Sequence, residues 1–263
     1  MILAVLQARS SSTRLPGKVL RPILGRPMLE RQIERIQRST LIGKLVVATS
    51  SHPEDTAIAD LCQGINISCF RGSLEDVLDR FYQAARPYQP EYVVRLTGDC
   101  PLADPGVIDD VIRFCRNGQY DYASNTLHPT FPDGLDVEVC RFASLEEVWR
   151  SASMKSQREH VTPYFYQNPH LFKLGNLVHE PDLSELRWTV DNAADFTLIS
   201  SVYEALYPDK PEFSTDDVLK FLESRPGLQN INAASHRNEG YLSSLAQDRP
   251  MTVSENPNRN TSR

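Results

Sequence analysis

Apolar stretches alternate with segments of helical periodicity along the first part of the chain. Stretches typical of buried parallel strands lie at residues 2–6, 45–48, 65–70 and 92–96. Residues 27–36 and 74–85 have apolar positions at helical spacing, and Pro53 with the two acids after it indicates another helix start. This alternation predicts an α/β fold of Rossmann-like type, in which a mostly parallel, twisted sheet has helices on both faces.

The second part of the chain is less regular. Its pattern predicts short strands at residues 120–125, 135–139 and 186–190. It predicts helices at residues 144–153 and 159–167, from Ala194, and at residues 215–223. We therefore expect a small mixed β region beside the parallel sheet, within one domain of residues 1–234.

The end of the chain is poor in apolar residues. Apolar content falls beyond about residue 235, and residues 248–263 are a polar run rich in Asn, Ser, Arg and Pro. Such a segment cannot bury enough apolar surface to offset the entropy lost on ordering. We therefore expect a disordered tail over residues 235–263.

The overall charge argues against some classes of binding partner. The formal net charge is -6 and the pI about 5.6, so the protein has no general attraction to nucleic acid or to an anionic membrane. The cysteines lack C-x-x-C spacing, no signal peptide is evident, and no apolar stretch reaches the roughly 18 residues that span a bilayer. We expect a cytoplasmic protein with reduced thiols, no nucleic-acid partner and no membrane insertion.

Four loops are expected at the carboxyl ends of the parallel strands, where ligands of such sheets bind. They cover residues 7–18, 49–52, 71–73 and 97–101. The first contains Arg9, Arg14 and Lys18 among hydroxyl residues, with Gly17 beside the lysine. Cations and backbone N–H groups together suit a polyphosphate, although a solvated basic loop is the alternative. The G-x-x-x-x-G-K-[ST] spacing of a Walker loop is absent.

The amino-acid sequence of this loop is more specific than its charge. QARSSSTRLPGKVL at residues 7–20 resembles the opening motif of the cytidylyltransferases that activate acidic sugars such as acylneuraminate and 3-deoxy-manno-octulosonate, and most of all their spore-coat polysaccharide, SpsF-like branch. The same branch is matched in order by VATS (47–50), FRGS (70–73), VRLTGDCPL (94–102), REHVT (158–162) and RWTVD (187–191). The resemblance covers roughly residues 1–225.

The resemblance implies a fold of the nucleotide-diphospho-sugar transferase type and a reaction. CMP would pass from CTP to a sugar or sugar acid, with release of pyrophosphate, in the synthesis of a surface polysaccharide or glycan. Homodimerisation is also implied. Arg9, Arg14 and Lys18 would stabilise the developing negative charge as catalytic cations. The expected nucleotide contacts are Leu6, Gln7, Ala8, Arg9, Ser10, Arg14, Lys18, Arg71, Ser73 and Thr97. Related enzymes often carry Gln at the place of Thr97, so base contacts here depart from the common pattern.

Two aspartates are candidate ligands for Mg²⁺. Asp99 follows the fourth expected strand, and the resemblance implies that it holds the ion together with Asp191 and phosphate oxygens. The alternative for Asp99 is a turn or helix-capping role. The alternative for Asp191 is the N-cap of the next helix, a place that Asn192 or Asp195 could also fill. The histidines and cysteines show no zinc spacing.

The acceptor sugar is expected over the second half of the sheet, because polar and aromatic residues suited to sugars gather there. The main candidates are Asn125, Glu138, Arg158 and His160, with Asp133, Asp136 and Trp188 as further ones. Each has a structural alternative. Glu138 alternates with apolar neighbours and could be the exposed side of a strand. Arg158 and His160 could be surface or capping residues, or His160 an ordinary half-buried histidine.

Two other functions fit part of this pattern. A glycosyltransferase would also use an α/β sheet and a metal carboxylate, but residues 98–100 are not the D-x-D pair usual in such enzymes. A non-catalytic nucleotide-binding protein would be expected to have lost some ligands, whereas the loop cations and both aspartates are present.

Overall fold

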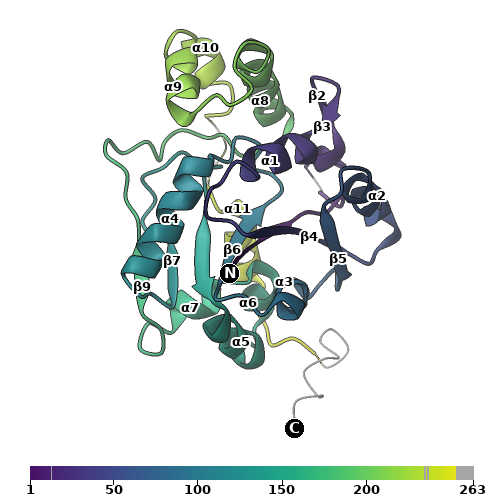
Figure 1. Cartoon of the computed structure of the whole chain (residues 1–263), viewed down its shortest axis with the longest axis vertical. Coiled ribbons are helices and arrows are strands. Elements are labelled where there is room, and N and C mark those ends of the chain that lie inside the picture. Colours follow the sequence, from purple (N-terminus) through teal and green to yellow (C-terminus); the bar gives the residue numbers. More distant parts are fainter. Residues whose placement is uncertain (13, 234, 236, 253–263) are drawn as a thin grey trace.

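A seven-stranded sheet lies at the centre of the computed structural model, which describes residues 1–12, 14–233, 235 and 237–252 (Figure 1). Its strand order is β5-β4-β1-β6-β8-β7-β9. The parallel strands are β1 (Ile2–Gln7), β4 (Lys44–Ser50), β5 (Ser68–Gly72) and β6 (Tyr92–Thr97). Antiparallel pairing joins β8 (Glu138–Arg141) to β6 and to β7 (Tyr122–Ser124), and β7 pairs in parallel with β9 (Leu174–Asn176). The expected α/β fold with its mixed β region is confirmed.

Both faces of the sheet need cover because successive strand residues are apolar. Ala4 and Leu6 belong to one core cluster, and Leu3 and Val5 belong to the other. The first face packs against α1 (Met28–Ile36), α2 (Thr56–Gly64), α4 (Pro105–Asn117), α8 (Ala193–Leu206) and α9 (Thr215–Glu223). The second packs against α3 (Val77–Ala85), α5 (Phe142–Ser151) and α7 (Pro163–Gln167). Helices on both faces are therefore confirmed.

Short elements connect these layers. They are η1 (Lys18–Leu20), β2 (Pro22–Ile23), β3 (Arg26–Pro27), η2 (Pro53–Asp55), η3 (Arg86–Tyr88), α6 (Lys155–His160), α10 (Pro226–Gln229) and α11 (Glu239–Ala246). No helix in the described residues is long and apolar enough to span a bilayer.

The strand order creates a switch point between β1 and β6. After β1 the chain builds outward through β4 and β5, and then crosses back to place β6 on the other side of β1. Ligand sites of such sheets lie where the order reverses, beyond the carboxyl ends of the strands. Here the two loops touch: the Gly98 N–H donates to the Gln7 carbonyl at 2.8 Å, and a Cβ on Gly98 would lie 3.0 Å from that of Ala8.

Residues 186–190 do not form the expected strand. They make only an isolated bridge, between Asp133 and Arg187, and then run against the loop after β6, where the Val190 N–H donates to the Asp99 carbonyl at 2.8 Å. Trp188 and Val190 are buried at alternate positions, so the local pattern resembled a strand. The segment crosses the carboxyl edge of the sheet and carries Asp191 to the switch point.

The expected helix over residues 159–167 is two helices. Between α6 and α7, Val161 has a positive φ of 72°, which ends the first helix, and Pro163 starts the second. The apolar positions of this stretch begin at the break itself, since Val161 and Phe165 are buried in the same core whereas the buried residues of α6 are polar.

Part of the expected disordered tail has a defined place. Helix α11 contacts α6, the Ser156 hydroxyl donates to Asp248 at 2.7 Å, and Met154 forms a bridge with Pro250. The structure therefore differs from the prediction over residues 237–252, because polar side chains there bond to particular polar groups of α6 instead of burying apolar surface. Residues 253–263 lie outside the described residues, and the domain limits stay a prediction.

Gly134 lets the 128–134 loop approach the segment that carries Asp191. Its φ is 109°, and a Cβ there would lie 2.6 Å from both the Thr189 nitrogen and the Trp188 carbonyl carbon. Only glycine adopts this conformation without strain, and backbone atoms cannot move aside easily.

Gly134→Ala is expected to lower the free energy of unfolding by at least about 2 kcal/mol, from backbone strain and the clash with Thr189. Gly227→Ala is the matched control, because a Cβ there meets nothing within 4 Å, and alanine in α10 should be neutral or stabilising by up to about 1 kcal/mol. Urea unfolding followed by circular dichroism measures both, and equal effects would contradict the strain at Gly134.

Candidate functional site

Lys18 joins the two predicted metal ligands. Its Nζ lies 3.3 Å from Asp99 Oδ2 and 2.9 Å from Asp191 Oδ1, and it donates to the Val190 carbonyl at 2.7 Å. The lysine comes from η1, whereas the aspartates follow β6 and the 186–190 segment. The structure therefore brings together, at the switch point, three charged residues that are far apart in sequence.

Lys18 and Asp99 hold each other in their charged forms. Burial alone would raise the pKa of Asp99, but the charge of Lys18 and hydrogen bonds from Thr97 and Lys18 lower it to about 2. Burial would lower the pKa of Lys18, but Asp99 and Asp191 outweigh it and raise that pKa. Lys18 and Asp99 thus stay ionised through the physiological range.

Helix capping does not explain either aspartate. The N-cap of α8 is Asn192, whose side chain accepts from the N–H groups of Ala194 and Asp195. The N-cap of α4 is Asp104, which accepts from the Gly106 N–H at 2.8 Å. Because other residues fill both capping positions, the capping alternatives for Asp99 and Asp191 are removed, while Asp99 does lie in the turn that follows β6.

The carboxylates of Asp99 and Asp191 have the chemistry that Mg²⁺ requires. Their side chains are 30% and 21% exposed, and both already share one ammonium cation. No group of three or more acid, His or Cys side chains suited to a metal occurs in the described residues. Mg²⁺ commonly uses one or two carboxylates and completes its shell with water and substrate phosphates, so this pair fits it.

Arg14 and Arg187 surround Asp191 with further positive charge. Arg14 lies 3.1 Å from Asp191 Oδ2 and also pairs with Glu239 of α11. Arg187 donates to Asp191 at 2.8 Å and to Asp133 at 2.7 Å. Of these, Arg14 is 43% exposed and so the better placed to meet a ligand.

The loop after β1 is braced at its start. Asp55 accepts from the Ser10 N–H at 2.6 Å and from the Ser50 hydroxyl at 2.5 Å. Gly17, with a φ of 66°, closes the loop by donating to the Ser10 carbonyl at 3.0 Å. Within the described residues, Arg9 is exposed and its side chain has no hydrogen bond. A braced loop with an exposed cation suits an anionic ligand.

The other predicted nucleotide contacts lie along the same edge of the sheet. The side chains of Leu6 and Ala8 are buried, so only their backbone can face a ligand. Arg71 donates to the carbonyls of Ser50 and His52, and the Ser73 hydroxyl accepts from the backbone N–H of Asp76 at the start of α3. Their assignment to the nucleotide stays a prediction.

Gln7 and Glu138 belong to one polar network on the face covered by α3, α5 and α7. Arg95 donates to Gln7 Oε1 at 3.0 Å and pairs with Glu138. Glu138 also accepts from the hydroxyls of Tyr122 at 2.5 Å and Thr162 at 2.6 Å. Glu138 is 9% exposed, so the alternative of an exposed strand residue is wrong.

Asn125 and Arg158 hold the fold together. The Asn125 side chain, fully buried, bonds to the backbone of Leu135 and Val137 at 2.8 Å. Arg158 is 1% exposed and forms a bidentate pair with Asp76 at 2.9 and 2.7 Å. These contacts argue against the predicted acceptor role, because neither side chain offers a free polar group to a sugar.

His160 lies between the network and the C-terminal helix. Its Nε2 is 2.9 Å from the Ser244 hydroxyl and its ring packs edge-on to Tyr241. Burial lowers the pKa of His160 to about 4, with Arg95 and Arg9 adding to this effect and Glu159 opposing it. The imidazole is therefore neutral at physiological pH.

Sequence reasoning missed several charged residues of this region. Arg95 and Arg187 lie inside motifs that carried the family resemblance, and that position was the one signal for them. Arg237 pairs with Asp136 at 2.6 Å and with Asp133 at 3.5 Å. Burial and the charge of Asp136 raise the pKa of Asp133 to about 6. Trp188 is buried in the core and so does not reach a sugar.

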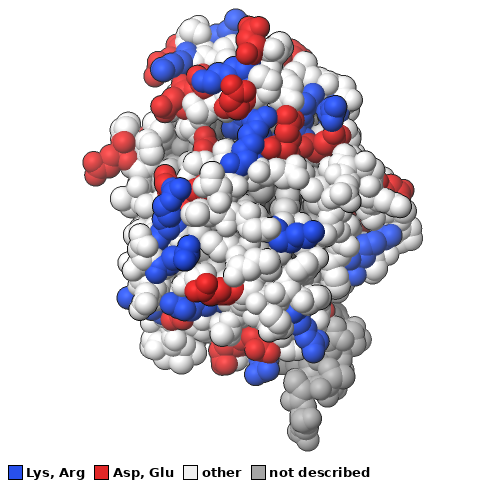
Figure 2. Space-filling view, in the orientation of Figure 1, with Lys and Arg blue, Asp and Glu red and all other residues white. Residues whose placement is uncertain are grey.

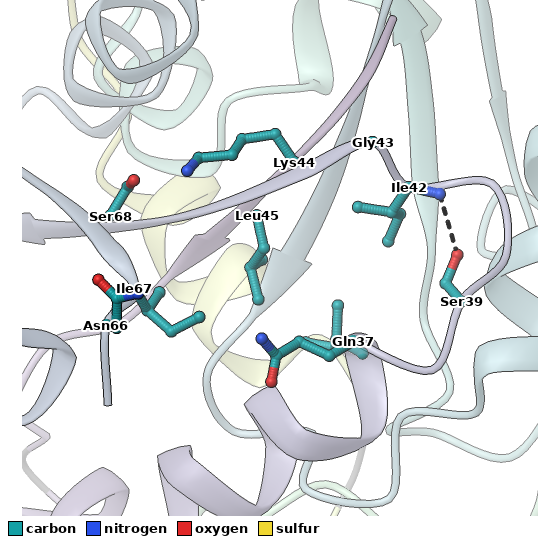
Figure 3. Close-up of a pocket in the computed structure, with 10 residues that line it drawn as sticks. Gln37, Ser39, Ile42, Gly43, Lys44, Leu45, Asn66, Ile67 and Ser68 are labelled. Atoms are coloured by element: carbon teal, nitrogen blue, oxygen red, sulfur yellow. Dashed lines mark hydrogen bonds between the residues drawn. The ribbon is translucent and has the colours of Figure 1, made fainter. Parts of the chain in front are cut away.

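A cavity lies at the opposite end of the sheet. It has a volume of about 280 Å³ and is lined by the end of α1, the turn after it and the first residues of β4 and β5 (Figure 3). It has no cluster of charged groups comparable to that at Lys18. On the face in Figure 2, basic and acidic side chains are interspersed, without a continuous basic surface.

Comparison with known proteins agrees on one family. Residues 3–212 match the cytidylyltransferase family. An uncharacterized protein of Methanocaldococcus jannaschii is 38% identical over 88% of this chain and 94% of its own length, and the spore coat polysaccharide biosynthesis protein SpsF of Bacillus subtilis is 33% identical over 86% and 95%. A cytidylyltransferase structure from Leptospira borgpetersenii has a TM-score of 0.81 and 31% identity over 87% of this chain and 96% of that one.

Arg158→Ala is expected to lower the free energy of unfolding by about 3–5 kcal/mol, because it strands the buried carboxylate of Asp76. Arg150→Ala, which removes an exposed pair with Glu146, should cost less than about 1 kcal/mol. Urea unfolding compares the two, and similar losses would contradict the structural assignment of Arg158.

The neutral state of His160 predicts a pH effect on stability. The unfolded chain binds a proton near pH 6.5 and the native histidine only near pH 4, so stability is complete above pH 6.5 and falls between those values. His160→Gln should remove about 2 kcal/mol of the stability lost between pH 7 and pH 5. Exposed His170→Gln is the control, and an unchanged pH profile in His160→Gln would refute the assignment.

Proposed function

This chain belongs to the cytidylyltransferase family, and from that premise we propose that it transfers CMP from CTP to a sugar or sugar acid, releasing pyrophosphate. A hydroxyl oxygen of the acceptor forms the new bond to the α-phosphorus and loses its proton. The bond from the α-phosphorus to the oxygen bridging to the β-phosphorus breaks, and pyrophosphate leaves with the electron pair. The observation that carries this proposal is the meeting of Lys18, Asp99 and Asp191 beside the loop after β1.

The cations of this loop would act on the phosphate charge. Lys18 is held rigidly by its three hydrogen bonds, and it can exchange an aspartate partner for a phosphate oxygen without moving far. Arg14 and Arg9 are more exposed and would grip the outer phosphates. Preorganised cations stabilise charge that develops as pyrophosphate leaves, and no covalent nucleophile is needed.

Asp99 and Asp191 would hold Mg²⁺ between the protein and the triphosphate. When bound, the ion would neutralise phosphate charge. The charge of Lys18 lowers the pKa of Asp99, so this carboxylate is ready to bind a cation at neutral pH.

The acceptor would lie on the β6–β8 side of the switch point. Glu138 and His160 remain the candidates there, whereas Asn125 and Arg158 act through the fold. The name of the Bacillus subtilis relative supports a role in polysaccharide synthesis. The family match favours nucleotidyl transfer over glycosyl transfer. Homodimerisation stays a prediction.

Wild-type protein with CTP, Mg²⁺ and a panel of acidic and amino sugars is expected to release pyrophosphate and to form a CMP-sugar detectable by mass spectrometry. Asp99→Asn should lower kcat/KM at least about 100-fold, because a charged ligand for the cation is lost. Asp110→Asn on the exposed side of α4 is the control. Near-normal pyrophosphate release by Asp99→Asn in excess Mg²⁺ would exclude the metal role.

A further inference from the structure

Arg80 is a buried cation without an acidic partner. It lies on α3, is 2% exposed, and forms no ion pair with any carboxylate in the described residues. Its Nη1 donates to the carbonyls of Ser73 at 2.6 Å and Leu74 at 3.5 Å. Its Nε is fully enclosed and has no hydrogen-bond partner. A buried guanidinium in this state is costly unless something neutralises it.

The nearest acids are already used by other groups. Asp76 accepts both hydrogen bonds of the Arg158 fork and one from the Asp79 N–H. Asp55 accepts from the Ser10 N–H and from the Ser50 hydroxyl. Their charges favour the guanidinium only from a distance. The local carboxylates therefore brace the loop after β1 and the start of α3, and they do not pair with Arg80.

A second arginine adds to the excess of positive charge. Burial lowers the pKa of Arg80 to about 10, and repulsion from Arg9 adds to this effect. Arg9 is exposed on the loop after β1, and its side chain has no hydrogen bond in the described part of the chain. The Nη2 of Arg80 also lacks a hydrogen bond there and, unlike Nε, is not fully enclosed.

The position of Arg80 and Arg9 in the fold indicates which anion they would meet. Helix α3 packs against β4 and β5, and Arg80 is tied to the loop that follows β5 (Figure 1). Gly72 allows this contact, because a Cβ there would lie 3.1 Å from Arg80 Cγ. Arg9 follows β1. Both arginines thus lie on the β5-β4-β1 half of the carboxyl edge, on the nucleotide side of the switch point and away from β8 and β7.

We propose that Arg80, together with Arg9, forms a second phosphate-binding site that receives an outer phosphate of the nucleoside triphosphate. The inference rests on the proposed function for the identity of the nucleotide, but the anion site itself does not. In the ligand-free protein the buried charge of Arg80 is not neutralised, and this raises the free energy of the folded state. Binding of a phosphate relieves that cost, so Arg80 contributes to affinity more than to stability.

The test measures binding and stability on the same full-length variants. Arg80→Met removes the charge, and Arg80→Gln also removes it but keeps a donor for the Ser73 carbonyl. The probes are inorganic tripolyphosphate and CTP, with dissociation constants measured by calorimetry at fixed salt. Both variants are expected to weaken both probes at least about tenfold. Arg86→Met, which removes an exposed charge just beyond α3, should change them less than about twofold.

Thermal unfolding separates a binding role from a structural one. Ligand-free Arg80 variants should lose much less stability than Arg158→Met, since no carboxylate is stranded. Tripolyphosphate should raise the Tm of the wild type more than that of either variant. Wild-type affinity for tripolyphosphate in Arg80→Met or Arg80→Gln would overturn the proposal, as would a raised acceptor KM with unchanged CTP affinity.

Failure of the proposed function would look different. A wild type that binds tripolyphosphate through Arg80 but forms no CMP-sugar would leave the anion site standing and remove the cytidylyl transfer. A wild type that forms product normally, with both probes unaffected by loss of Arg80, would remove the anion site alone.

Discussion

The shared hydrogen bonds of Lys18 organise the edge of the sheet on which this protein depends. One ammonium group joins residues 81 and 173 positions away along the chain, and its bond to the Val190 carbonyl holds the segment that crosses the strand ends. The arrangement works because the strand order reverses between β1 and β6, which places the loops after these strands side by side. Gly98 and Gly134 then allow backbones to approach where side chains would block them.

The arginines along this edge of the sheet differ in burial and in how far carboxylates neutralise them. Arg158 and Arg187 are buried and matched with carboxylates, so they stabilise the layers without offering charge to a ligand. Arg9 and Arg14 are exposed, and Arg80 is buried without an acid. The buried, matched cations build the scaffold, and the exposed or unmatched ones surround the place where a polyanion would bind. Arginine thus serves two purposes here, to hold the layers together and to face a ligand, and its exposure and its pairing with carboxylates distinguish the two.

The C-terminal segment connects the two halves of the site. Glu239 pairs with Arg14, Arg237 pairs with Asp136, and Ser244 meets His160. These contacts reach both the loop after β1 and the β6–β8 side of the switch point. A polar composition was a poor guide here, because ordering came from specific ion pairs and hydrogen bonds with groups distant in sequence.

The sequence by itself determined the layers of the fold and the loops of the site. Buried parallel strands are apolar on both faces, and phosphate loops need cations and glycine next to a strand end, so both leave local signals. Only the tertiary structure decided what each polar residue does. Asn125 and Arg158 look like sugar ligands in sequence, yet they bond to Val137 and Asp76. Residues 186–190 have the pattern of a strand but cross the sheet edge. Arg80 gave no signal at all, because whether a charge is neutralised depends on which distant groups surround it, and sequence spacing does not encode that.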